Sequence, residues 1–293
     1  MKSKIKDNLD NIVFDTINVV LLAIFTILIV VPLWNVLVSS FASSQALAQG
    51  NFVFFPDSWS LENYRAVLND DTILRAFFIS VARTVVGVVT HVFFCAMMAY
   101  AMSKPYLKGR KLYSAMGITT MFFSGGMIPM YLLIRSLGLL NSFWVYIIPA
   151  LLSYFNVIVL MNFFRSIPDS IEEAAEIDGA GYWRRFFLIS LPLVKPALAT
   201  VALFNGVGQW NDFMTARLYV TDRSLWPLQM RLYQIIVQSQ TQGMENMTTA
   251  IQMTTTRGIQ LATIVVTTLP ILLIYPLLQK HFVSGMMLGG VKE

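Results

Sequence analysis

The chain has 293 residues, of which 56% are hydrophobic and 13% charged, whereas an average soluble domain has about 25% charged residues. This composition argues against a soluble protein. The net charge of +5 comes from basic residues that flank apolar segments, a pattern of membrane orientation rather than of nucleic-acid binding. A single cysteine, Cys95, excludes an internal disulfide and a cysteine-based metal site.

Long stretches without Asp, Glu, Lys or Arg indicate the fold class. About 20 apolar residues cross the core of a bilayer as a helix. The sequence therefore predicts an all-α, polytopic membrane protein that forms one transmembrane domain over residues 1–293. The six expected spans are 17–39, 77–102, 113–135, 144–165, 197–217 and 259–279.

The first span has an alternative interpretation as a cleaved signal peptide. Three lysines precede it, and Ala46, Leu47 and Ala48 resemble a cleavage site. However, the apolar stretch is longer than a typical signal-peptide core, and three acidic residues, Asp7, Asp10 and Asp15, follow the lysines. These features favour an uncleaved first span.

The distribution of Lys and Arg predicts the topology. Most of these residues fall in the N-terminus, in 103–112, in 165–196 and in the C-terminal tail. Cytoplasmic loops are enriched in basic residues, so both termini are expected in the cytoplasm. Segments 40–76 and 218–258 are then extracytoplasmic, and apolar residues at helical spacing in the second of these predict a helix there.

The loop 165–196 is the most polar internal segment. Ser170 and Glu173 fit a capping box, so a short helix is expected to start at Ser170 and to end at Gly179. A second helical piece should break at Leu191–Pro192, and Pro196 should open the next span. Because a two-turn helix is not stable alone, it is either an ordinary surface helix or a docking element held by the bundle and a partner.

The spacing in this loop resembles the EAA loop of ABC importer permeases, with Glu173-Ala174-Ala175, Gly179, Ile189 and Leu191-Pro192 at the family's positions. Residues 60–68, 139–152, 210–213 and 278–293 are similar to binding-protein-dependent sugar permeases, including the second permease of the maltose importer. Residues 122–129 ("FFSGGMIP") resemble a subgroup that handles complex and acidic oligosaccharides, such as those from pectin and alginate.

The resemblance implies the fold of type I importers and transport by alternating access in the bacterial cytoplasmic (inner) membrane. The implied partners are a second permease in a heterodimer, two ATPase subunits, an extracytoplasmic solute-binding protein and an oligosaccharide. The residues expected to couple the permease to the ATPase are Glu172, Glu173, Ala174, Ala175, Asp178, Gly179, Ile189, Leu191 and Pro192. Glu173 is expected to pair with a basic residue of the ATPase.

This chain is not expected to be an enzyme or to hold a cofactor. It has no Gly-Lys pair and hence no P-loop, so ATP should be bound by the partner subunits. An ion-coupled secondary transporter is the alternative from another class, but it would need buried carboxylates in the spans, which hold almost none. A structural membrane scaffold would leave the EAA-like loop unexplained. An ABC permease for neutral sugars is the other alternative.

Span five carries the strongest candidates for a substrate pathway. Asn205, Gln209 and Asp212 are spaced four and three apart, which places them on one helical face that should point into the bundle. The structural alternative is hydrogen bonding between helices, with two neighbouring glycines allowing close approach. Asp212 could also pair with Arg217.

Five further residues have weaker assignments. Arg83 in span two could attract an anionic sugar, but snorkelling of its long side chain to the interface is preferred. Trp210 and Tyr154 are candidates for stacking on sugar rings. His91 is expected to be a hydrogen-bonded packing residue, and Tyr146 an aromatic residue at the membrane interface.

Overall fold

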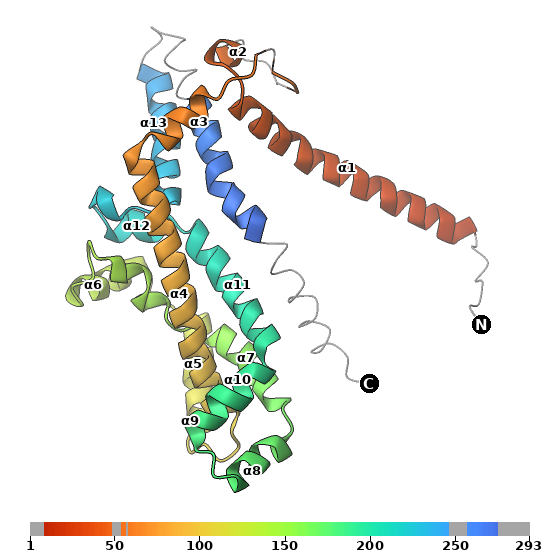
Figure 1. Cartoon of the computed structure of the whole chain (residues 1–293), viewed down its shortest axis with the longest axis vertical. Coiled ribbons are helices and arrows are strands. Elements are labelled where there is room, and N and C mark those ends of the chain that lie inside the picture. The colour runs from red at the N-terminus through yellow and green to blue at the C-terminus, as the bar shows by residue number, and fades with distance from the viewer. Residues whose placement is uncertain (1–8, 49–53, 57, 246–256, 275–293) are drawn as a thin grey trace. The chain divides into compact units, whose positions relative to one another are not determined.

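The computed structural model describes residues 9–48, 54–56, 58–245 and 257–274, and the regular elements in these ranges are helical. This confirms the all-α prediction (Figure 1). The elements are α1 (Leu9–Ser40), α2 (Ser44–Ala48), α3 (Glu62–Leu68), α4 (Asp71–Ser103), α5 (Arg110–Phe122), α6 (Met127–Ser136), η1 (Phe143–Tyr146), η2 (Ile148–Ala150), α7 (Tyr154–Arg165), α8 (Asp169–Ile177), α9 (Tyr182–Arg184), η3 (Arg185–Ser190), α10 (Leu191–Leu193), α11 (Lys195–Asn211), α12 (Met214–Tyr219), η4 (Arg223–Leu225), α13 (Leu228–Glu245) and a last helix, Arg257–Ile274.

Three of the expected spans are single long helices, and three are bent pairs of helices. The single helices are Ile12–Ser40, Asp71–Ser103 and Arg257–Ile274. If each bent pair is one crossing, six crossings result, as predicted. The N-terminal lysines, the end of 259–279, the tail 278–293 and part of 218–258 lie outside the described residues. The helix expected within 218–258 is present as α13.

The expected span 113–135 is not one helix. It consists of α5 and α6, which meet at an angle of 116°. Between them the chain leaves the helical conformation, and Gly126 has a φ of +85°. This is a conformation that glycine adopts without the steric cost of a Cβ atom, so the glycines at this point allow the sharp turn.

Spans four and five also depart from straight helices. The segment expected at 144–165 begins with 3₁₀ turns around Pro149 and bends by 51° into α7. The span expected at 197–217 ends at Asn211, where Asp212 adopts an extended backbone before α12 starts. Pro149 has no backbone N–H to donate in a helix, which accounts for the irregular start of span four.

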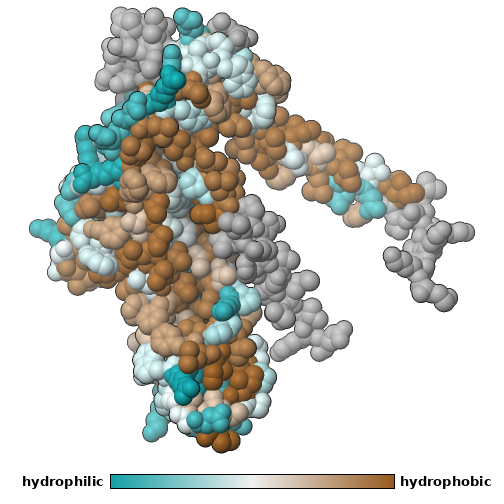
Figure 2. Space-filling view, viewed as in Figure 1, coloured by the Kyte–Doolittle hydropathy of each residue, from teal (hydrophilic) through white to brown (hydrophobic). Residues whose placement is uncertain are grey.

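The chain forms two compact units, and the first contains α1–α3 and residues 257–266. In this unit α1 is apolar (Figure 2), and most of its side chains are exposed. The turn that follows α1 is fixed by the buried Asn63 of α3, whose Nδ2 donates to the carbonyls of Ser40 and Ala42 at 3.2 and 3.1 Å. An apolar helix whose side chains are mostly exposed suits a lipid environment.

The second unit, which includes α4–α12, contains the core that positions both candidate sites. Helix α4 packs along α7 and α11. Small side chains such as Ala96, Ala99 and Ala197 are buried at these contacts beside Val157 and Leu160. Small residues let helix backbones approach closely in membranes, so α4, α7 and α11 form a tightly packed frame.

Candidate functional site

Helix α8 forms the polar loop, but it starts one residue earlier than predicted. It begins at Asp169, with Pro168 at the N-cap position and no side-chain capping bond. The capping box of Ser170 and Glu173 is therefore wrong, because Ser170 already lies in the first turn. Asp169 and Glu172 in that turn still favour the helix through its dipole.

The end of α8 agrees with the prediction. Gly179 has a φ of +76°. Its N–H donates to the carbonyl of Glu176 at 3.0 Å, and the N–H of Ala180 donates to the carbonyl of Ala175 at 2.9 Å. These two bonds form a Schellman motif, which glycine favours because of its left-handed backbone.

Two acids of α8 point back toward the bundle. Glu172 forms an ion pair with Lys104 at the end of α4 and accepts a hydrogen bond from the buried Ser190 hydroxyl at 3.1 Å. Glu176 pairs with Nη1 of Arg185 at 2.8 Å. Burial opposes the charge of Arg185, but the Glu176 carboxylate outweighs it, so the pKa of Arg185 lies above its ordinary value. These contacts hold α8 on the frame.

The other face of α8 is free of such contacts. Glu173, Ala174 and Ile177 are exposed, and Ile177 keeps 86% of its surface accessible. Among the residues that the structure describes, Glu173 has no hydrogen bond or ion pair. A carboxylate and an isoleucine one helical turn apart therefore face outward on a helix that is fixed from behind.

The chain returns to the bundle through an irregular helix. Residues Arg185–Ser190 form a π-helical turn, which contains the half-buried Ile189. Leu191 and Pro192 continue as a helical turn, and the break predicted at these residues lies instead at Val194, where the axis bends by 81° into α11. Pro192 has no N–H for the carbonyl four residues earlier, and π turns are a known local adjustment to such a mismatch.

A hollow of about 820 Å³ lies among α4, α6, α7, α11 and α12. Asn205, Gln209 and Asp212 line it together, as their spacing predicts, and Arg83 joins them. Gly208 also lines the hollow, whereas a Cβ on Gly206 would lie 3.3 Å from Val88 of α4. Close approach between helices thus applies at Gly206, while Gly208 faces the hollow, and the substrate pathway stays a prediction.

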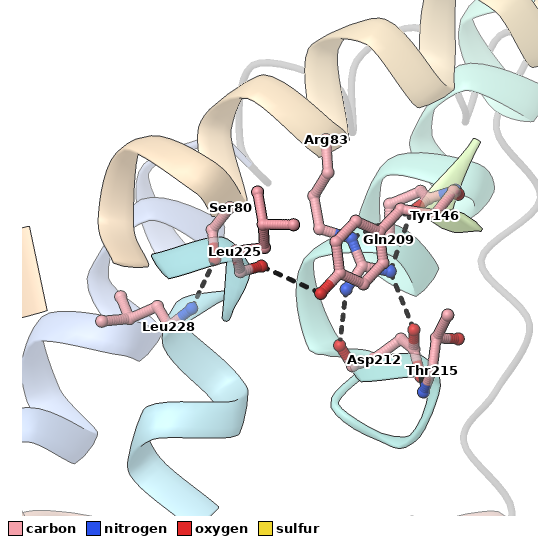
Figure 3. Close-up of polar contacts among 8 residues, drawn as sticks. All are labelled: Ser80, Arg83, Tyr146, Gln209, Asp212, Thr215, Leu225 and Leu228. Atoms are coloured by element: carbon pink, nitrogen blue, oxygen red, sulfur yellow. Dashed lines mark hydrogen bonds and ion pairs between the residues drawn. The ribbon is translucent and has the colours of Figure 1, made fainter. Parts of the chain in front are cut away.

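Arg83 is buried, with 2% of its surface exposed, so snorkelling is wrong. Its Nε and Nη2 donate to Oε1 of Gln209 at 3.2 and 3.0 Å, and Nη2 also pairs with Oδ2 of Asp212 at 2.8 Å (Figure 3). Its Nη1 donates to the carbonyl of Asp212 at 2.9 Å. The guanidinium lies 4.3 Å from the centre of the Tyr146 ring.

These contacts correct two further expectations. Asp212 pairs with Arg83 and not with Arg217, which instead donates to the hydroxyl of Tyr233. Tyr146 is 2% exposed, and its hydroxyl donates to the carbonyl of Leu225 at 2.9 Å, so it is not an interface residue (Figure 3). Arg83 satisfies a carbonyl where α11 breaks, as buried backbone groups require.

His91 is buried and hydrogen-bonded, as expected. Its Nδ1 lies 2.7 Å from the carbonyl oxygen of Ala150, and its Nε2 lies 2.8 Å from Nδ2 of Asn156. A carbonyl only accepts, so Nδ1 carries the proton and Nε2 accepts from the Asn156 amide. This is the pattern of a neutral imidazole.

The two aromatic candidates do not line the hollow. Trp210 is buried, and its indole N–H donates to the carbonyl of Thr267 at 3.0 Å. The ring of Tyr154 fills the space beside Gly117, where a Cβ would lie 2.2 Å from the ring. Stacking on sugar is thus not supported by the position of either residue.

Sequence reasoning missed three parts of this site. Asn156 of α7 and Tyr146 of η1 line the hollow from mostly apolar segments, and the sequence indicated Tyr146 only as an interface residue. Gly87 was also missed, and a Cβ there would lie 3.0 Å from the Gln209 side chain. In the described residues no group of three or more His, Cys, Asp and Glu could hold a metal ion.

Comparison with known proteins places the chain in a family. The model of the "binding-protein-dependent transport system inner membrane component" family matches residues 8–288. The chain belongs to this family. It is therefore a multi-pass component of the inner membrane, a transport subunit of sugar ABC importers.

Two relatives in Bacillus subtilis (strain 168) are similar to this chain over nearly their whole length. Protein LplC is 44% identical over 96% of this chain and 95% of its own. The polygalacturonan/rhamnogalacturonan transport system permease protein YtcP is 42% identical over 96% and 99%.

A solved structure has the same fold. It is the crystal structure of a bacterial ABC transporter involved in the import of the acidic polysaccharide alginate. The chain matches it with a TM-score of 0.86 and 32% identity, over 94% of this chain and 98% of the other. The family permease fold is thus confirmed along nearly the whole chain.

Proposed function

We propose that this family member imports acidic oligosaccharides of the pectin or alginate type. The likeness to the alginate importer carries the proposal, and the likeness to the polygalacturonan/rhamnogalacturonan permease supports it. The test is reconstitution in liposomes with the ATPase subunits, the second permease and the binding protein. Uronate oligosaccharides should stimulate ATP hydrolysis. Stimulation by neutral oligosaccharides alone would reject the acidic substrate, and no stimulation by either would reject sugar import.

The proposal assigns ATP binding and hydrolysis to two partner subunits. It also places the binding protein outside the membrane, and the loop 165–196 and both termini in the cytoplasm. In this arrangement α8 docks on an ATPase. The support is local: Glu172 and Glu176 fix α8 from behind, while Glu173 and Ile177 remain exposed for a partner.

The docking assignment is tested by Glu173→Ala. Removing one member of a desolvated, hydrogen-bonded charge pair costs roughly 2–5 kcal/mol of binding, whereas an exposed acid without a partner contributes little to folding. We expect normal membrane levels with loss of ATPase co-purification or of stimulated activity. Glu62→Ala, another exposed acid, is the matched control. Normal assembly and activity in Glu173→Ala would show that this carboxylate does not dock.

The proposed substrate pathway passes through the hollow. Asn205, Gln209 and Asp212 line it with Arg83, and α4 and α11 place them. Amide and carboxylate groups on one concave surface are suited to the hydroxyl groups of sugars. Trp210 and Tyr154 are not included, because their side chains do not line the hollow.

A further inference from the structure

The hollow has a balanced set of charges. Its described lining holds one cation, Arg83, and one anion, Asp212, which form an ion pair. His91 also lines it, but its hydrogen bonds are those of a neutral imidazole. Across the residues that the structure describes, this subunit therefore offers no net positive charge to a passing sugar.

The positive member of the pair is also inaccessible. The Arg83 side chain is 2% exposed, and its Nε, Nη1 and Nη2 all donate to Gln209 or Asp212. The Asp212 side chain is 28% exposed. A sugar carboxylate would have to displace Asp212 or Gln209 before it could pair with the guanidinium, whose contacts are drawn in Figure 3.

The remaining polar lining consists of neutral groups. Asn205 has its Oδ1 atom buried without a hydrogen-bond partner in the described structure. Thr215 and Tyr219 add side-chain hydroxyls to the wall of the hollow. An unpaired buried acceptor costs free energy, and a sugar hydroxyl is a donor that would satisfy it.

We propose that Asp212 makes this subunit's part of the pathway charge-neutral, so that it binds sugar rings through their hydroxyl groups and does not select them by their carboxylates. The inference rests on the proposed import of oligosaccharides. It assigns selection for acidic sugars to the binding protein or the second permease. Asp212 is thus a specificity-determining residue that acts by cancelling the charge of Arg83.

The test uses the complete complex and two forms of one uronate oligosaccharide, the free acid and a partly methyl-esterified form. Both are delivered on saturating binding protein, whose affinity for each is measured separately. The readout is the maximal ATPase rate stimulated by the free acid divided by the maximal rate stimulated by the esterified form. For the wild type this ratio should be close to one. In Asp212→Asn the uncancelled Arg83 should raise it about fivefold, as expected for one unit charge about 8 Å away at an effective dielectric constant of about 40.

The double variant Arg83→Gln/Asp212→Asn decides the question even if Asp212→Asn alone does not assemble. It has no buried charge without a partner, and its hollow is again neutral, so its ratio should equal that of the wild type. Selective loss of stimulation by the free acid in this variant would overturn the inference, because Arg83 would then be the residue that recognises the carboxylate. A strong preference of the wild type for the free acid would also overturn it. If neither form stimulates the wild type, the proposed function itself fails.

Discussion

The ion pair of Glu172 and Lys104 should hold the coupling loop on the membrane bundle. Both side chains are 14% exposed, and Glu172 also accepts from the buried Ser190. Removing one partner of a fully buried pair costs about 3–5 kcal/mol, whereas an exposed pair contributes about 0–1 kcal/mol. Glu172→Gln keeps an acceptor for Ser190 but leaves Lys104 without its counter-charge, so we expect a loss of about 2 kcal/mol.

The assay exploits the single cysteine, Cys95, which is fully buried. The complex is assembled with cysteine-free partner subunits and heated with a thiol-reactive fluorescent dye, which reacts when the bundle opens. A loss of 2 kcal/mol should lower the midpoint by roughly 5 °C on the scale of soluble domains. Because membrane complexes unfold irreversibly, the variants are ranked at one heating rate. Glu62→Gln, the same change at an exposed acid of α3, is the control and should stay within about 1 °C.

A second substitution separates the ion pair from other roles of Glu172. Lys104→Met removes the charge that Glu172→Gln leaves unpaired, and methionine can keep the contact with the Tyr100 ring, which lies 4.3 Å from the lysine nitrogen. The double variant should therefore recover most of the lost stability, since replacing both members of a buried pair is often neutral. Equal midpoints for Glu172→Gln and Glu62→Gln, or no recovery in the double variant, would refute the reasoning.

Three further predictions concern the backbone, the packing and the topology. Gly179→Ala should destabilise the loop by about 1–2 kcal/mol in the same dye assay, because alanine resists a φ of +76°, and Gly179→Asn should cost less. Gly117→Ala should lower the midpoint through overpacking worth about 1–3 kcal/mol, because a Cβ would lie 2.2 Å from the Tyr154 ring; an unchanged midpoint would contradict this contact. Ser170→Cys in a Cys95→Ser background should react with a membrane-impermeant maleimide only after permeabilisation, and labelling of intact cells would reverse the proposed topology.

The sequence predicts the features of this protein that depend on local composition and spacing. Charge-free stretches locate the membrane segments, because burying charge in lipid is costly. Gly179 marks the end of α8 because of its backbone freedom. The spacing of Asn205, Gln209 and Asp212 predicts their common face, which follows from the helical period alone.

The direction of the helices and the contacts between residues far apart in the sequence could not be predicted in the same way. Hydropathy does not distinguish a straight span from α5 and α6, which form an angle of 116° with each other. The signal for this bend is the pair Gly125–Gly126, which also belongs to the stretch that resembles the acidic-oligosaccharide subgroup. Arg83 and Asp212 are separated by 129 residues, so helical periodicity gives no information on their contact. Without that partner, an arginine near a span end is interpreted as snorkelling.

The two candidate sites are built on the same pair of helices, and this bears on how force could pass between them. At its C-terminal end α4 is followed by Lys104, which holds α8 through Glu172. Twenty-one residues earlier, about 32 Å along the helix at 1.5 Å per residue, Arg83 holds Gln209 and the residue after α11, Asp212. The loop itself continues through the bend at Val194 into α11. A displacement of α8 by a docked partner would therefore act on both α4 and α11, and the buried contacts of Arg83 would have to move with them or break.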